Sequence, residues 1–294
     1  MKGNLLTHRR AVALMVLVAL MWSTAGVVTR HLDSARSFEI TFWRSFFTAL
    51  SLLIILPLFQ GRAVFTRIRQ GGKALWLSGL CWCVMFTAFM VAITLTTIAN
   101  VLVTLALGPL FTALLARIFT NHRIPGRTWL AIALAGVGIV WMFGGQADLS
   151  AQLAGTLVAL LVPMAAAINW TVVQHSQSHG QKIDLVPAVL LGALISCLVT
   201  LPLAWPLAAT PHDLGLLGFL GLTQLAIPCV LAVWCATVLK APEISLLALL
   251  EIIFGILLAW VGAGEVPGSS VLYGGALVIG ALVINELMAW REKA

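Results

Sequence analysis

Long, nearly uninterrupted runs of apolar residues alternate along the chain with short polar connectors. A helix needs roughly 20 apolar residues to cross a hydrocarbon core of about 30 Å, since each residue rises about 1.5 Å. The runs are continuously apolar and lack the alternation of membrane β-strands, so we expect α-helices. Ten segments are predicted to span the membrane: 11–29, 38–59, 74–93, 98–118, 128–144, 153–173, 184–205, 214–238, 243–262 and 270–289.

The basic residues gather on every second connector. With ten spans, the amino terminus, the even-numbered connectors and the carboxyl terminus share one side of the membrane, which holds 14 Lys and Arg residues. The other side holds only Arg30 and Arg36, and Arg44 falls inside the second span. Because basic connectors remain in the cytoplasm, we predict a multi-pass protein of the bacterial inner (plasma) membrane with both termini cytoplasmic.

The composition leads to the same class of protein. Of 294 residues, 61% are hydrophobic and 9% are charged, and the mean hydropathy is +1.05. The net charge of +7 follows from the basic connectors, so membrane lipids are expected partners and nucleic acid is not. The first 25 residues resemble a secretory signal sequence, but the nine later spans favour an uncleaved first helix.

An internal repeat divides the chain into two halves. Residues 105–125 and 248–267 each contain a polar or small interruption, a phenylalanine three residues later, apolar helix and a Pro-Gly turn. A weaker correspondence sets residues 27–31 (Val-Val-Thr-Arg-His) beside residues 171–175 (Thr-Val-Val-Gln-His). The halves are residues 1–145 and 150–294, with five spans each. Because five is odd, the second half enters the membrane from the opposite side, which predicts an inverted pair of five-helix repeats.

The motifs resemble the EamA-type branch of the drug/metabolite transporter superfamily, and most closely its YddG-type bacterial aromatic amino-acid exporters. The resemblance covers essentially the whole chain. It rests on Gly-Pro-Leu-Phe-Thr-Ala-Leu-Leu at 108–115, Phe-Trp-Arg at 42–44, Gly-Glu at 264–265, and on Trp22, Trp234 and Glu251. Two positions depart from the family pattern, since Ile252 replaces a usual proline and Asn121-His122 replaces a common Gly-Glu pair.

The resemblance implies an all-α integral membrane fold of ten transmembrane helices in two inverted five-helix repeats, with a central cavity between spans 1, 3, 4, 6, 8 and 9. The implied activity is export of small molecules. Neither a cofactor nor a metal is expected, and the protein is expected to act as a monomer or homodimer.

Polar residues inside the spans are the candidates for substrate binding, because a polar group at membrane depth is costly unless it is used or satisfied. Glu251 is the one carboxyl group well inside a span, where it binds a substrate amino group or a proton, or is a structural acid. Arg44 either binds a substrate carboxylate or pairs with Glu39 or with helix carbonyls. The predicted substrate-binding residues are Trp22, Ser23, Thr87, Thr104, Asn169, Gln224, Trp234 and Glu251.

We therefore predict a secondary transporter that exports small amphipathic metabolites, amino acids first, by alternating access. An alternative is a multidrug or organic-cation exporter that uses Glu251 as its cation or proton site. We expect no enzymatic activity, because the spans contain no paired aspartates, histidines or phosphate-binding loop. A lipid-modifying enzyme would have to use His122, His175 and His179, and a non-enzymatic assembly partner would carry no solute flux.

Overall fold

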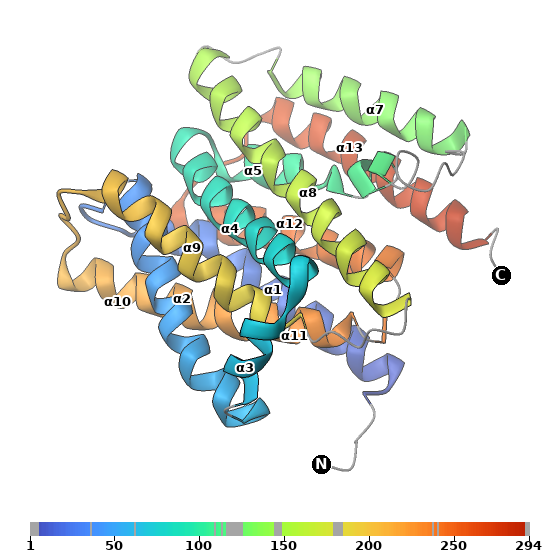
Figure 1. Cartoon of the computed structure of the whole chain (residues 1–294). Coiled ribbons are helices and arrows are strands. Elements are labelled where there is room, and N and C mark those ends of the chain that lie inside the picture. The colour runs from blue at the N-terminus through green and yellow to red at the C-terminus, as the bar shows by residue number, and fades with distance from the viewer. Residues whose placement is uncertain are drawn as a thin grey trace.

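The structure is a computed structural model that describes residues 6–35, 37–61, 63–108, 110–112, 114–115, 126–143, 149–178, 185–236, 238–239 and 241–291. Over these residues the chain is all-helical, with no β-strand, and its helices form one layered bundle (Figure 1). In chain order they are α1 His8–Thr29, α2 Ser37–Gln60, α3 Ala63–Gln70, α4 Gly72–Leu95, α5 Ile98–Leu105, α7 Gly126–Phe143, α8 Leu149–Ser178, α9 Pro187–Ala204, α10 Pro211–Phe219, the π-helix η1 Leu220–Ala226, α11 Ile227–Cys235, α12 Ala241–Ala263 and α13 Ser269–Arg291.

Six stretches of the described residues are helical, long and apolar enough to cross a membrane. They are His8–Thr29, Ser37–Gln60, Gly72–Leu95, Leu153–Val172, Pro187–Ala204 and Pro211–Cys235. Shorter apolar helical stretches, Ile98–Thr112, Trp129–Gly138, Leu247–Ala263 and Ser269–Asn285, fall in the other four predicted spans. The expectation of an all-helical, multi-pass membrane protein is therefore confirmed. The count of ten spans stays a prediction.

One helix was not predicted. The connector after the second span contains α3, which has Arg67 and Arg69 in its last turn. Val64 of α3 is buried, and Ile68 packs against the same core cluster one turn later. Apolar side chains four residues apart share one face of a helix, and this face of α3 packs against the bundle beside α2 and α9.

The helices pack in pairs that join the two halves of the chain. Helix α4 packs on α8 and α9, α2 packs on α9 and η1, and α1 packs on α11 and α12. Helices α7 and α13 lie side by side at one edge of the bundle (Figure 1), and α5 lies against α8 and α12. The main pairings between the two halves are preserved when each helix is exchanged for the one five spans later. Thus α4 with α8 corresponds to α11 with α1, and α5 with α8 corresponds to α12 with α1.

Hydrogen bonds between connectors define one end of this bundle. Both carboxylate oxygens of Asp213, at the start of α10, accept from backbone amides between α1 and α2, those of Asp33 at 2.7 Å and Ser34 at 3.1 Å. Glu39, in the first turn of α2, accepts from the amides of Ala208 and Ala209 before α10 at 2.8 and 2.7 Å. We name this the Arg30 end, where α1 and α12 end, and the opposite one the His8 end, where α1 and α12 begin.

Candidate functional site

A large cavity lies between the helices and is lined from both halves of the chain. The empty space between its walls, counting the part that is open to solvent, is about 1080 Å³. The lining residues within the described part of the chain are Met15, Trp22, Arg44, Trp82, Met85, Phe86, Phe89, Leu105, Gly108, Thr112, Val162, Pro163, Ala166, Ala167, Trp170, Gln224, Leu225, Cys229, Ile244, Ala248, Leu249, Glu251 and Ile252. They come from predicted spans 1, 3, 4, 6, 8 and 9, and Arg44 adds the second span.

The cavity reaches toward the His8 end of the bundle. Met15 lies in the first half of α1 and Ile244 in the first turn of α12, and both line the cavity. No described residue from the last turn of α1 or of α12 lines it. The Arg30 end is therefore the closed end in this conformation.

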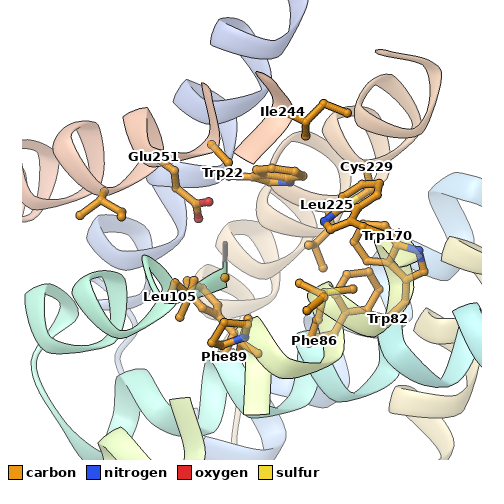
Figure 2. Close-up of a pocket in the computed structure, with 18 of the residues that line it drawn as sticks. Trp22, Trp82, Phe86, Phe89, Leu105, Trp170, Leu225, Cys229, Ile244 and Glu251 are labelled. Atoms are coloured by element: carbon orange, nitrogen blue, oxygen red, sulfur yellow. The ribbon is translucent and has the colours of Figure 1, made fainter. Parts of the chain in front are cut away.

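Aromatic side chains form one wall. Trp82, Phe86 and Phe89 recur at helical spacing on one face of α4, and Trp170 of α8 meets Trp82 edge-on with ring centroids 6.3 Å apart. Figure 2 shows Trp22 above these rings, with the carboxyl group of Glu251 directed from α12 into the space that they face. This wall favours solutes with an apolar or aromatic portion.

The guanidinium of Arg44 is buried at the cavity, with a side chain only 1% exposed. Its Nη1 donates to Gln224 Oε1 at 3.0 Å and its Nη2 donates to the Phe86 carbonyl at 2.7 Å. It also lies 5.9 Å from the centre of the Phe89 ring, within cation–π range. Among the described residues, Nε has no hydrogen-bond partner. The sequence suggested Glu39 or a helix carbonyl as a structural partner of Arg44. The structure shows the Phe86 carbonyl in this role, whereas Glu39 accepts hydrogen bonds from the amides of Ala208 and Ala209.

Gln224 is positioned by an irregular helix. Pro228 has no N–H to offer the carbonyl four residues earlier, and the ladder widens so that the Ile227 N–H reaches the Leu222 carbonyl, five residues back. Gly221 lets this π-helix approach α2, because a Cβ atom there would lie 2.8 Å from the Thr48 nitrogen. The Gln224 amide nitrogen donates to the Trp22 carbonyl at 3.5 Å, so one side chain links η1, α1 and Arg44.

Glu251 brings the second charge to the cavity. It is half-buried on α12, and within the described ranges it makes no hydrogen bond and no ion pair with the protein. A carboxylate held in an apolar wall is costly unless water or a cationic group meets it. The cavity therefore has a guanidinium on α2 and a carboxyl group on α12, separated by aromatic and apolar surface.

The other predicted site residues lie outside the lining. Thr87 bonds Ser196 Oγ at 2.9 Å, Asn169 accepts from Ser78 Oγ at 2.6 Å, and Trp234 is 47% exposed on the outer surface of the bundle. The hydroxyls of Ser23 and Thr104 donate to carbonyls of their own helices, at Leu20 and Asn100. Of the eight predicted residues, only Trp22, Gln224 and Glu251 line the cavity.

Several lining residues are not among the eight predicted substrate-binding residues. The aromatic stripe formed by Trp82, Phe86 and Phe89 has the i, i+4, i+7 spacing of one helix face, a signal that was available but shared with ordinary apolar packing. Cys229 has no distinguishing sequence signal, whereas Gly108 begins the motif at 108–115. The sequence alone leaves the role of Arg44 open.

Comparison with known proteins gives two matches to one family model, described as the EamA-like transporter family, at residues 9–144 and 153–286. The chain is 25% identical over 311 residues to an S-adenosylmethionine uptake transporter of Rickettsia conorii, covering 100% of this chain and 99% of that one. It is 24% identical over 282 residues to the pseudopaline exporter CntI of Pseudomonas aeruginosa, covering 94% and 95%.

A shorter match, 28% identical over 206 residues and 64% of each chain, is to a probable terminal-alkyne amino-acid exporter of Streptantibioticus cattleyicolor. A solved crystal structure shares the fold with a TM-score of 0.68 at 16% identity, covering 98% of this chain and 100% of that one. Because the family model matches most of the sequence and recurs in each half, the chain belongs to the EamA-like transporter family.

Proposed function

We propose that this protein is a secondary transporter that exports small amphipathic metabolites, amino acids first, across the bacterial inner membrane by alternating access. The observation that carries the proposal is the cavity. It is built from both halves of the chain, it has apolar aromatic walls, and it places two opposite charges against that surface. A solute with an apolar portion and charged groups of both signs matches these features best.

Residues 1–145 and 150–294 serve in this proposal as two five-helix repeats of opposite orientation, ten spans in all. The two separate family matches support the division into repeats. The exchange of helix pairs between spans n and n+5 supports a two-fold relation between them. Repeats inverted in this way can rock against each other, so that one midplane site faces each side of the membrane in turn.

The relatives and the charge pattern support the direction and the orientation. Two of the relatives are named exporters, one of them for an amino acid, although a third is named an uptake transporter. The basic connectors support cytoplasmic termini, and the His8 end, toward which the cavity reaches, is then the cytoplasmic end. A cavity reaching the cytoplasmic side is the state in which an exporter loads its solute.

An organic-cation exporter is the second candidate, because Glu251 offers a carboxyl group to the cavity without a protein partner among the described residues. The two functions predict different competitors.

Counterflow of labelled amino acids into proteoliposomes of the purified protein distinguishes the two candidates. We expect unlabelled amino acids with apolar side chains to compete and lipophilic cations without a carboxylate to compete weakly or not at all. Competition by the cations alone would support the second candidate. Absence of flux for both classes would contradict a transport function for these solutes.

A further inference from the structure

We infer that the transported solute carries a carboxylate and that this carboxylate binds Arg44. This inference rests on the proposed function and narrows its substrate class, since it selects zwitterions over simple cations. It depends on the surroundings of the Arg44 side chain.

Within the part of the chain that the structure describes, the charge of Arg44 has no counter-ion. Of the five N–H donors of a guanidinium, one on Nη1 and one on Nη2 are used, and both go to uncharged acceptors. Nε is buried without a partner among the described residues. Glu39, the acid on the same helix, accepts from two backbone amides and from the Trp43 indole at 3.4 Å. A buried guanidinium left without an anion is strongly unfavourable, so an anion from the cavity would relieve that cost.

A carboxylate suits the donors that remain. Nε and the spare N–H on a terminal nitrogen point along one edge of the planar fork, which matches the two oxygens of a carboxylate. Gln224 and the Phe86 carbonyl each accept one of the other N–H groups and so fix the plane of the fork. These two contacts position Arg44 and are not themselves part of the anion site.

The rest of the cavity then orients the solute. Glu251 lies on α12, on another wall of the same cavity, and its carboxyl group is directed into it (Figure 2). A solute whose carboxylate is on Arg44 can present an ammonium group to Glu251 and its apolar portion to Trp82, Phe86 and Trp170. An amino acid carries a carboxylate, an ammonium group and, in many cases, an apolar side chain, so amino acids and their analogues offer one group to each of these three surfaces.

The test uses the unmodified protein first. In competition counterflow and in thermal-shift binding, we compare an apolar amino acid with its amide, its methyl ester and the amine that lacks the carboxyl group. We expect the three neutralised or truncated compounds to bind about 10- to 100-fold more weakly, the range for loss of a charged hydrogen bond. Arg44→Lys keeps the charge but not the fork and should weaken amino-acid binding, while its thermal unfolding reports whether the bundle is intact.

Two results would overturn this inference. One is equal binding of the amino acid and its amine, and the other is no binding of any carboxylate solute in the thermal-shift assay. Binding of carboxylates without any flux would keep the anion site and contradict the proposed transport function. The two failures are therefore distinguishable.

A different set of contacts, at the Arg30 end of the bundle, supports a second inference. Arg30, after α1, makes a salt bridge from Nε to Glu265 Oε2 at 2.9 Å, and its Nη2 donates to the Thr96 carbonyl at 3.3 Å. The other oxygen of Glu265 accepts from the Ile98 amide at 2.8 Å. We name these four residues the ionic latch. They join the connector after α1, the α4–α5 connector and the α12–α13 connector.

We propose that the ionic latch holds the Arg30 end closed and must break for the cavity to open there. This proposal rests on alternating access. The latch joins α1 and α5 of the first half to α12 of the second, so separation of the halves at this end pulls it apart. Glu265 follows Gly264, whose φ of +66° lies in the left-handed region that favours glycine. This backbone turn aims the carboxylate back over the end of the bundle.

The internal repeat does not encode a corresponding ion pair for the His8 end of the bundle. Arg30 corresponds to Gln174 in the second half, and the first-half connector before Pro125 has no acidic residue between positions 113 and 125. An Arg–carboxylate pair of this kind is therefore encoded once in the two repeats. The latch favours the conformation with a closed Arg30 end over its mirror state, in agreement with a cavity that reaches the His8 end.

Hydrogen–deuterium exchange of the peptide that contains Ile98 tests the latch without a transport assay. Arg30→Gln should raise its exchange rate about two- to fivefold, a modest effect because the bridge is partly exposed. His212→Gln is the matched control, since His212 pairs with Asp33 at the same end, 3.1 Å away, and does not touch the latch. Faster exchange only in Arg30→Gln supports the proposal. Wild-type exchange in Arg30→Gln, or an equal increase in the control, would overturn it.

Discussion

Replacing Ala248 by phenylalanine is expected to reduce counterflow at least tenfold while the protein remains folded. Ala248 lines the cavity from α12, one turn before Ile252 and close to Glu251. A phenyl ring in place of a methyl group occupies space that the solute needs. Ala248 is only partly buried and borders the cavity, so we expect the cost of overpacking to be small. Initial rates of counterflow and the thermal midpoint, measured on the same preparation, check both parts.

Ile253→Phe is the matched control for this change. Ile253 is on the same helix and 46% exposed on the outer surface, so the introduced ring meets lipid and leaves the cavity unchanged. We expect wild-type rates for the control. Equal rates in Ala248→Phe and Ile253→Phe, with both proteins folded, would show that solute does not pass through this cavity.

The second large effect is expected from Glu251→Gln. If Glu251 receives the ammonium group of the solute, loss of its charge weakens binding by about 1.5–3 kcal/mol, or roughly 10- to 100-fold in affinity. Counterflow at equal pH on both sides measures this directly, because no gradient is needed. Gln has the same shape, and the side chain has no protein partner among the described residues, so stability should change little.

The same variant separates the two roles considered for Glu251. A proton carrier would be dispensable in counterflow and essential for accumulation driven by a pH gradient. Retained counterflow with lost gradient-driven flux would therefore contradict the ammonium site and indicate proton coupling. Asp33→Asn is the control, since Asp33 lies at the Arg30 end, where it pairs with His212.

The membrane fold could be predicted because length and hydropathy are local properties. The predicted span 184–205 became α9 at Pro187–Ala204, and the span 38–59 became α2 at Ser37–Gln60. Helix α3 was missed because two turns are too short to give a strong periodic signal, although Val64 and Ile68 already mark one apolar face. The change from α-helix to the π-helix η1 could not be predicted as such. Pro228, which follows η1, indicated only that the helix bends nearby.

The site was harder to predict, because helices that are apolar on all sides give no stripe that identifies the inner face. The hydroxyls of Thr104 and Ser23 donate to carbonyls of their own helices. The sequence does not indicate whether a hydroxyl makes such a bond or faces a cavity. The sequence offers Glu39, five residues away, as a partner for Arg44. In the structure the side-chain partner of Arg44 is Gln224, 180 residues away. Such a contact follows from the packing of α2 on η1, which no local pattern encodes.

The central claim is that one cavity faces the two sides of the membrane alternately. A cysteine introduced at Leu105, which lines the cavity (Figure 2), tests it after Cys81, Cys83, Cys197, Cys229 and Cys235 are replaced by alanine. In oriented vesicles that retain counterflow, a membrane-impermeant thiol reagent should modify this cysteine from either face. A transported amino acid should slow both reactions. Modification from one face alone, whatever solute is present, would contradict alternating access.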